Sequence, residues 1–595
     1  MLRKWIALSL LAWLAVAVGQ DVAAAAPTAG ARLNSLVNRY FEEQLKLSPI
    51  GATYIGDHRY DDKYTNSISP KFVKEQAARE RRYLKEVEAI DPATLNGADR
   101  ITYDVFKYDR ETTIDGIRFP GELLPIDQIN NPVTQFAVFA SGTSAQPFKT
   151  VKDYDRFLRR TDEFLVFLDQ SITNMRVGIT KNVVQPRVLM EKVLPQLNEL
   201  VKDNVEDSVF YGPIKALPKD FSAADRKRLT AAYTREITAK VNPSLTRLRD
   251  FLRDEYIPHG RTTVAWSALP DGKAWYDYTL VTFTTTHMPA EDIHQLGLQE
   301  VARIRGEMQD VMHQVGFQGD LHQFFKFMQT DPQFLFKSGE DALNQYRAVK
   351  LKVESLLPKM FQDFPKATYE IKEVEPFRAA SEAGAFYEPG SEDGTRPGTF
   401  YVNTSDLSRV PRYGMETLSL HEAEPGHHFQ ITIAQEIKDI PRYRRYSGSS
   451  AYFEGWALYC ESIGKELGLF TDPYQYYGRL NDEMLRAMRL VVDTGLHAKD
   501  WTREQAIAYM IDNSSLSEPE VVAEVERYIA WPGQATAYKV GQIRIRAMRE
   551  RAEKALGSKF NVKDFHSQIL LDGALPMDVL DAKVDRWIAA TLKSP

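Results

Sequence analysis

Apolar residues recur every three or four positions along most of this 595-residue chain, with charged residues between them. The pattern runs through residues 31–90, 153–200 and 225–256, and it predicts amphipathic helices in each of these segments. No segment repeats with a period of roughly 20 to 50 residues, so a solenoid is not expected. The sequence therefore predicts a mainly α fold, built as a multi-helix body.

Two stretches break the helical pattern. Ala274–His287 (AWYDYTLVTFTTTH) and Thr399–Thr404 (TFYVNT) are rich in β-branched and aromatic residues, which favour strands. Each is a candidate short strand, and we expect a small sheet edge just upstream of the histidine-rich segment described below. Such an edge could pair with an extended peptide through its free backbone groups. A structural hairpin that covers the core is the alternative.

The N-terminus has the pattern of an export signal. Arg3 and Lys4 precede an apolar run from Trp5 to Val18, and small residues suited to cleavage follow it. We therefore assign residues 1–25 to a signal peptide and expect a periplasmic or secreted protein. The apolar run is shorter than the roughly 20 residues that span a bilayer, so stable membrane insertion is not expected.

Composition narrows the class of protein. The single cysteine, Cys460, excludes an intramolecular disulfide. The formal net charge of −6 comes from acidic and basic residues spread along the chain, without the basic stripe that binds a phosphate backbone, so nucleic acid is not an expected partner. Residues 31–595 are expected to form a helical domain, either undivided or split into lobes 31–300 and 301–595. The sequence leaves the oligomeric state open.

The densest group of chemically reactive side chains is the segment HEAEPGHH, which begins at His421. Catalytic zinc sites use three imidazole or carboxylate ligands and leave a fourth position for water. The familiar arrangement is His-Glu-x-x-His on a helix, in which the glutamate acts as general base. Glu422 occupies the position of that base. The fourth position after His421 is Pro425, however, which cannot coordinate a metal ion.

This spacing requires the helix to bulge. On a regular helix His427 would lie on a different face from His421, and His428 would share the face but lie about 10.5 Å along the axis. Pro425 breaks the ladder of hydrogen bonds, and Gly426 accepts dihedral angles that strain other residues. With these residues looped out, either His427 or His428 can return toward His421. The sequence predicts His421 and one of these two histidines as zinc ligands.

A third ligand is expected from Ala451–Ile463 (AYFEGWALYCESI), a nearly apolar stretch that predicts a buried helix. It carries Glu454 and Glu461, and a buried carboxylate is costly unless it is paired or binds a metal ion. Glu454 is the predicted third ligand. Glu461, two turns later, is predicted to accept a hydrogen bond from a ligand imidazole. The alternative is that both glutamates form salt bridges with arginines, namely Arg444, Arg445 or Arg489.

Two further candidates follow. Asp493 and His497 stand at helical spacing, so the carboxylate could orient the imidazole toward the substrate or the transition state. An ordinary helix end around Gly495 is the alternative. Tyr538 stands among small residues in a predicted helix and could stabilise the oxyanion of a tetrahedral intermediate. Simple helix packing is the alternative for this tyrosine.

Together these segments resemble the bacterial domain-of-unknown-function 885 family, whose members are similar to helical zinc peptidases such as neurolysin and angiotensin-converting enzyme. The resemblance covers most of the mature chain. It rests on TDPQFLFKSGEDALNQYR (330–347), GTFYVNT (398–404), HEAEPGHHFQ (421–430), AYFEGWALYCE (451–461), RLVVDTGLH (489–497) and GQATAYKVGQ (533–542). It implies an elongated helical body with a deep cleft, lined by a short strand whose residues Phe400, Tyr401 and Asn403 would contact substrate.

Carried over from the zinc peptidases, the resemblance implies one zinc ion held by His421, by one of the two later histidines and by Glu454. Glu422 would be the base and Tyr538 the oxyanion donor. The expected function is a peptidase that hydrolyses short peptides in the periplasm. Two alternatives stay open: a metal-dependent hydrolase of a non-peptide amide or ester, and a periplasmic binding protein without turnover.

Overall fold

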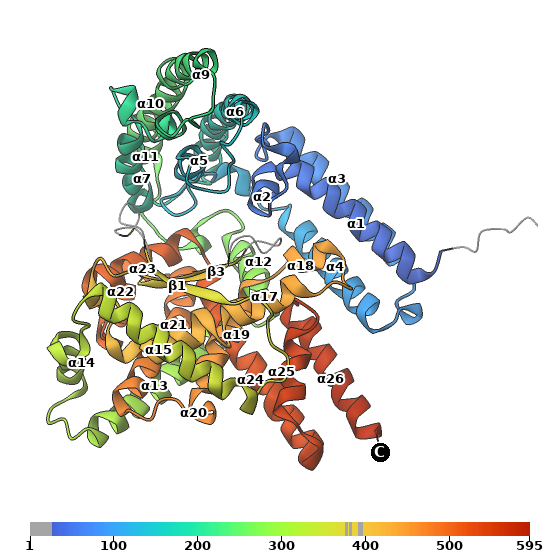
Figure 1. The fold of residues 1–595 in the computed structure, drawn as a ribbon, viewed down its shortest axis with the longest axis vertical. Coiled ribbons are helices and arrows are strands. Elements are labelled where there is room, and N and C mark those ends of the chain that lie inside the picture. The colour runs from blue at the N-terminus through green and yellow to red at the C-terminus, as the bar shows by residue number, and fades with distance from the viewer. Residues whose placement is uncertain (1–26, 375–378, 380–383, 391–396, 595) are drawn as a thin grey trace, which may run out of the picture.

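The computed structural model describes residues 27–374, 379, 384–390 and 397–594, so the predicted signal peptide lies outside the described residues. The fold is mainly α with one small sheet, which confirms the predicted fold class (Figure 1). Among the described residues, no helix combines the length and the apolar character that a membrane crossing requires.

The helices begin and end as follows. Before the sheet lie α1 (Ala29–Leu47), α2 (Pro49–Tyr54), α3 (Pro70–Glu88), α4 (Gly97–Gly116), α5 (Pro132–Ala140), α6 (Val151–Lys181), α7 (Arg187–Leu200), α8 (Gly212–Lys215), α9 (Ala223–Glu236), α10 (Asn242–Phe251), α11 (Ile257–His259), α12 (Gly272–Thr284), α13 (Ala290–Gln314), α14 (Leu321–Thr330) and α15 (Gly339–Leu356). After it lie α16 (Met415–Leu418), α17 (His427–Glu436), α18 (Arg442–Tyr446), α19 (Ser450–Ser462), α20 (Gly464–Leu467), α21 (Pro473–Ala498), α22 (Arg503–Asn513), α23 (Glu518–Ala530), α24 (Ala537–Leu556), α25 (Val562–Leu570) and α26 (Met577–Lys593). The segments that the apolar spacing predicts as helical are helical.

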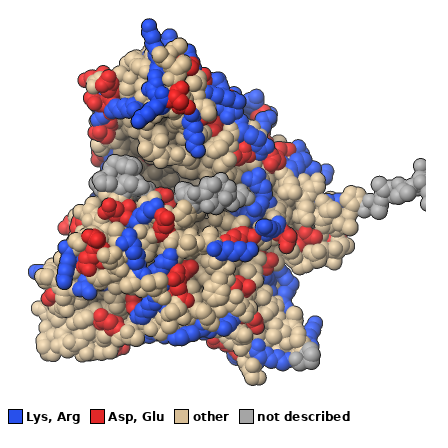
Figure 2. Space-filling view, in the orientation of Figure 1, with Lys and Arg blue, Asp and Glu red and all other residues tan. Residues whose placement is uncertain are grey.

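Helices α5–α11 form an upper lobe in Figure 1, with a hydrophobic core of its own that includes Phe136 and Leu245. The N-terminal helices α1–α4 share a different core with the C-terminal helices, in which Leu33 and Trp456 belong to one buried cluster. Figure 2 shows the surface hollowed between the upper lobe and the body below it.

Close backbone contacts fix the helices that carry the predicted site. A Cβ atom added at Gly455 of α19 would lie 2.5 Å from the backbone of Gly541 in α24, so only glycine permits this approach. A Cβ atom at Gly297 of α13 would lie 2.7 Å from the side chain of Leu490 in α21. Helix α21 also contacts α16 and α19. These contacts place α16, α19, α21 and α24 around one region of the molecule.

The sheet contains β1 (Tyr369–Glu373), β2 (Ala385–Glu388) and β3 (Gly398–Val402) in the order β1-β3-β2. The candidate strand at Thr399–Thr404 is therefore confirmed as β3. It is the central strand, parallel to β1 and antiparallel to β2, so its backbone groups are paired on both sides. The edge nearest the histidine-rich segment belongs instead to β2, which contacts the residues around His421.

The strand expected within Ala274–His287 is wrong, because Gly272–Thr284 forms the helix α12. Three threonine hydroxyls donate to backbone carbonyls one turn earlier: Thr279 at 2.8 Å, Thr282 at 2.9 Å and Thr284 at 2.7 Å. These bonds satisfy the hydroxyl groups within a helix. Packing of the buried face of α12 then outweighs the strand propensity of its residues.

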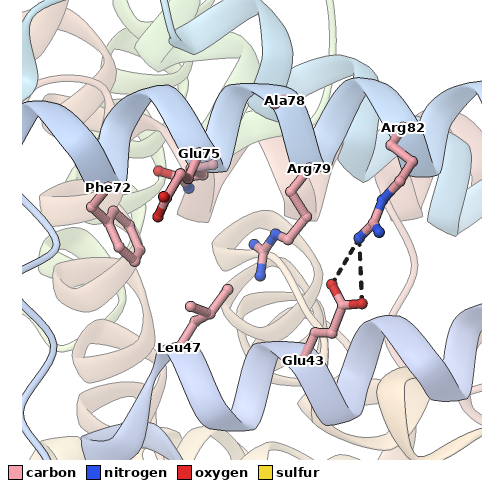
Figure 3. Close-up of a pocket in the computed structure, with 8 residues that line it drawn as sticks. Glu43, Leu47, Phe72, Glu75, Ala78, Arg79 and Arg82 are labelled. Atoms are coloured by element: carbon pink, nitrogen blue, oxygen red, sulfur yellow. Dashed lines mark hydrogen bonds and ion pairs between the residues drawn. The ribbon is translucent and has the colours of Figure 1, made fainter.

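A surface depression lies between α1 and α3 (Figure 3). Leu47 and Phe72 line it, and Arg82 bridges the two helices to Glu43 across 2.9 Å. Neither helix carries a residue that the sequence predicts for the functional site. The predicted metal ligands lie elsewhere in the fold, where α19 meets the segment that follows α16.

Candidate metal centre

The segment that carries His421 bends. Helix α16 continues into a single π-helical turn, η13 (Ser419–Ala423), a form that is rare and frequent at functional sites. The chain leaves the helix at Glu424, whose backbone is extended, and re-enters a helix at His427, the first residue of α17. The connection consists of Glu424, Pro425 and Gly426.

Two of the connecting residues, Pro425 and Gly426, fix the bend. A Cβ atom at Gly426 would lie 1.9 Å from the carbonyl oxygen of His421, so a larger residue would force the arms of the bend apart. The carbonyl oxygen of Pro425 accepts hydrogen bonds from Nε1 of Trp456 at 2.8 Å and from Sγ of Cys460 at 3.5 Å. Both donors lie on α19. The bend is therefore attached to the helix that carries the predicted third ligand.

Substitution Gly426→Ala is expected to destabilise the fold by about 1–3 kcal/mol, the usual cost of an extra methyl group in a packed site. Gly306→Ala is the matched control, because Gly306 lies within α13 and a Cβ atom there meets nothing within 4 Å. Alanine favours helix, so the control should be neutral or more stable by up to about 1 kcal/mol. Urea unfolding measures both free energies, and equal values for the two variants would contradict the role of Gly426.

Three side chains converge beside the bend: His421, His427 and Glu454. Their candidate ligand atoms all lie within 4.8 Å of one another. The Nε2 atom of His421 lies 3.5 Å from Oε2 of Glu454, and the Nε2 atom of His427 lies 3.6 Å from the same oxygen. The two imidazole rings meet at 87°. The residues therefore surround a common point from two sides of the bend and from α19.

This donor set fits a zinc ion. Tetrahedral ligands at about 2.1 Å from an ion lie roughly 3.4 Å apart, close to the separations found here. The Oε2 atom of Glu454 is buried and has no hydrogen-bond partner among the described residues, although it faces both imidazoles. Such an oxygen is costly unless a cation or a donor compensates it. Two histidines and one glutamate would leave the fourth position for water.

The electrostatics of the three residues favour a cation. Burial on its own would lower the pKa of His421, but the nearby carboxylates of Glu454, Glu461 and Glu422 raise it to about 10. Burial on its own would raise the pKa of Glu454, but its contacts with His421 and His427 hold it well below its usual range. The raised pKa of His421 shows that negative charge surrounds its imidazole, and the lowered pKa of Glu454 keeps its side chain a carboxylate, so this environment stabilises positive charge.

Glu461 orients His421. Its Oε1 atom accepts a hydrogen bond from Nδ1 of His421 at 2.7 Å, which leaves Nε2 to face the common point. Two of the three arginines named as alternative partners of the two glutamates, Arg444 and Arg489, bond elsewhere. Arg444 donates to a backbone carbonyl, and Arg489 pairs with Glu524 at 2.9 Å. The buried carboxylates of α19 are therefore turned toward the histidines.

Glu422 lies beside the three converging residues without being one of them. Its Oε1 atom is 4.0 Å from Nε2 of His421. Its side chain is 13% exposed, so water can reach the carboxylate. A general base needs this kind of position, within reach of a water molecule next to the ion and free to exchange a proton.

His428 points away from the common point. Its Nδ1 atom forms a hydrogen bond with the hydroxyl of Tyr387 in β2 at 2.9 Å, and its Nε2 atom faces Glu424 at 3.9 Å. Burial lowers the pKa of His428 to about 4. The sequence leaves open whether His427 or His428 is the second histidine ligand. Because only His427 belongs to the converging group, it is the candidate that the geometry favours.

Asp493 and His497 do not form the predicted pair, because other groups engage both side chains. Asp493 accepts hydrogen bonds from the hydroxyl of Tyr276 at 2.6 Å and from the amide of Gly533 at 3.0 Å. The ring of His497 accepts from a backbone amide at 3.2 Å and bonds the carbonyl of Tyr528 at 3.0 Å. Both residues are fully buried. The geometry fits the alternative, a helix end packed into the core.

Tyr538 lies in the first turn of α24, surrounded by arginines. Its ring lies below the guanidinium of Arg489 at 4.6 Å, and its hydroxyl accepts a hydrogen bond from Arg527 at 3.3 Å. Its role as a hydrogen-bond donor to an oxyanion stays a prediction.

The three residues predicted to contact substrate lie on β3 or just after it. Phe400 is fully buried and packs edge to face on Tyr346, and Asn403 is buried and donates to a backbone carbonyl at 2.7 Å. Tyr401 is partly exposed and stacks on Phe386 of β2. Successive side chains of a strand face opposite sides, so β3 turns Tyr401 outward and Phe400 into the core.

Two residues near the site are not predicted from the sequence. Tyr387 reaches His428 from β2, and the charges of Asp482 and Glu461 hold the pKa of Arg486 on α21 above its usual value against the effect of burial. A charged residue within a buried helix was the available signal for Arg486, because burial of a charge is costly without a partner. Tyr387 lies next to a turn-rich stretch and carried no comparable signal.

Comparisons with other proteins agree with this architecture. The chain is similar over 95% of its length, with 28% sequence identity and a TM-score of 0.87, to all of the crystal structure of "the putative lipoprotein from Colwellia psychrerythraea". It shares its fold with "a putative lipoprotein of unknown function from Shewanella oneidensis", with 18% identity, a TM-score of 0.75 and coverage of 94% of this chain and 99% of that one. No curated protein matches the sequence. The profile of "Bacterial protein of unknown function (DUF885)" matches residues 49–584, and the chain therefore belongs to this family.

Proposed function

We propose that this protein is a zinc-dependent peptidase that hydrolyses short peptides. The observation that carries the proposal is the buried Oε2 atom of Glu454, which faces the Nε2 atoms of His421 and His427 and has no other partner among the described residues. Glu422 stands 4.0 Å from one of these nitrogens, where a base would be required. The four residues together supply a ligand set and a proton acceptor.

Peptides are the proposed substrates because an edge strand of the sheet borders these residues. Among the described strands β2 lies at the edge of the sheet, and it contacts η13, which carries His421 and Glu422. An extended peptide can add to such an edge through its backbone hydrogen bonds. Strand addition would hold a peptide bond beside Glu422 without requiring a particular side chain.

Each residue of the site has a proposed role. His421, His427 and Glu454 would hold the ion, with Glu461 keeping the ring of His421 in orientation. Zinc, when bound, would supply water activation and polarisation of the scissile carbonyl. Glu422 would accept the proton of the attacking water and deliver it to the leaving amine. Tyr538 is proposed as a hydrogen-bond donor to the developing oxyanion.

The proposed location is the periplasm or the exterior of the cell. The N-terminal sequence supports it, because two basic residues precede a short apolar run and small residues. The similar structures from Colwellia and Shewanella belong to proteins described as lipoproteins, which agrees with export.

Elemental analysis of the purified chain, combined with digestion of a peptide library, tests the proposal. We expect about one zinc ion per chain and cleavage that stops after chelation and returns with zinc. Cleavage of non-peptide amides or esters alone would favour the second hydrolase class. A metal held with no turnover of any library would favour a binding protein, and a chain without affinity for zinc would exclude the site.

A further inference from the structure

A group of buried and half-buried arginines lies near the candidate metal centre. Arg486 and Arg489 stand one turn apart on α21, and Arg527 of α23 shares the carboxylate of Glu524 with Arg489. Helix α21 contacts both α16, which leads into η13, and α19. The helix that carries Arg486 and Arg489 therefore packs against both parts of the chain that form the metal centre.

Two guanidinium nitrogens in this group lack partners. Arg489 is 4% exposed and donates to Glu524 through Nε at 3.2 Å and Nη2 at 2.9 Å. Its Nη1 atom and the Nε atom of Arg486 are buried without a hydrogen-bond partner among the described residues. A guanidinium has five N–H donors, and a buried donor on a charged group is costly to leave unpaired. The two nitrogens thus call for an acceptor that the described chain does not provide.

The guanidinium groups are held in fixed positions. The ring of Tyr538 supports Arg489 from one face at 4.6 Å, a cation–π contact. Glu524 accepts a hydrogen bond from Arg489 at 2.9 Å, and Asp482 accepts a hydrogen bond from Arg486 through its backbone carbonyl at 3.2 Å. Donors that are positioned before a ligand arrives bind it at a lower entropic cost.

Asp482 connects the arginine group to the metal centre. The carboxylate of Asp482 lies 3.5 Å from Nη1 of Arg486, one turn further along α21. It also lies within electrostatic range of His421 and Glu461 at the metal centre. A ligand that spans from the bend to α21 would meet both.

We infer that Arg486 and Arg489 bind a carboxylate of the substrate, so that the chain cleaves peptides with a free C-terminal carboxyl group close to the scissile bond. The inference rests on the proposed function and adds a substrate class to it. A planar guanidinium matches the geometry of a carboxylate, which can accept several N–H donors at once. The unpaired nitrogens of Arg486 and Arg489 are the donors that such a carboxylate would satisfy.

Binding of two N-acetylated tripeptide libraries tests the inference, one with free C-terminal carboxyl groups and one with carboxamides. Equilibrium dialysis against the full chain, carrying Glu422→Gln and loaded with zinc, gives the bound fraction of each library by mass spectrometry. We expect the free acids to bind about tenfold more tightly or better, the value of one hydrogen bond between charged groups. Turnover of the same libraries by the chain with its native Glu422 should show the same preference in kcat/KM.

Conservative variants identify the donors. Arg489→Lys and Arg486→Lys keep the positive charge but remove the planar set of N–H donors. Each should therefore lower the ratio of the affinity for free acids to that for carboxamides to about threefold or less. Binding of the carboxamides should stay the same. Arg479→Lys is the matched control, because Arg479 is a buried arginine of the same helix that pairs with Glu483 at 2.6 Å, and its variant should keep the full preference.

The outcomes separate the inference from the proposed function. Equal binding of acids and carboxamides, binding of neither, or a full preference retained in both arginine variants would overturn the carboxylate site. Hydrolysis of acids and carboxamides at equal kcat/KM would count against the carboxylate site and leave the peptidase standing. Preference for acids with no hydrolysis of either library would count against the peptidase and leave the carboxylate site standing.

Discussion

Replacement of Glu422 by glutamine is expected to lower peptide hydrolysis by about 10³-fold, within the range that loss of a positioned base produces, while zinc binding is retained. The amide has nearly the shape of the carboxylate but cannot accept a proton from water. Glu422 is not one of the three converging residues, and its Oε1 atom lies 4.0 Å from Nε2 of His421. The loss should therefore appear in kcat, with metal content unchanged.

Glu424→Gln provides the matched control for this experiment. Glu424 lies two residues further along the chain, but it faces His428 at 3.9 Å and is absent from the converging group. Its variant should keep turnover within a few-fold of the unmodified chain, since no proton transfer is assigned to it. Equal turnover by Glu422→Gln and the unmodified chain, at equal zinc content, would exclude Glu422 as the base.

The parts of the fold that follow from local pattern could be predicted from the sequence. The long helices α3 and α6 bury one apolar face, and β3 follows from a run of aromatic and β-branched residues. The bend also follows from local chemistry, because proline and glycine stand where a regular helix would separate the histidines. Glu454 and Glu461 could be identified because carboxylates on an apolar helix require partners.

The remaining features depend on contacts between distant parts of the chain. Asp493 and His497 have the spacing of a pair, yet Tyr276 and the backbone around Gly533 and Tyr528 take their hydrogen bonds. Helix α12 has the composition of a strand and forms a helix because of what it packs against. Adjacent residues of a sequence, such as His427 and His428, cannot be ranked as ligands until the direction of each side chain is known.

Removal of the imidazole of His427 is expected to abolish tight zinc binding, whereas the same change at His428 is not. His427→Ala deletes one of three ligands, which should weaken the zinc affinity by more than about 100-fold, the upper range found for loss of a residue that only supports a ligand. His428→Ala leaves His421, His427 and Glu454 in place. Competition with a chromogenic chelator measures both affinities.

The effect on thermal stability of the zinc-free chain should be the reverse, larger for His428→Ala than for His427→Ala. His428 is buried, bonds Tyr387 and packs against Tyr369 with ring centroids 4.7 Å apart, so His428→Ala should lower the melting temperature of the zinc-free chain. His427→Ala should change that temperature little but should remove the stabilisation by added zinc, which amounts to roughly 4 kcal/mol at a thousandfold excess over the dissociation constant. If His428→Ala lost zinc while His427→Ala kept it, His428 would be the ligand in place of His427. The convergence of His421 and His427 at the bend would then not be a metal site.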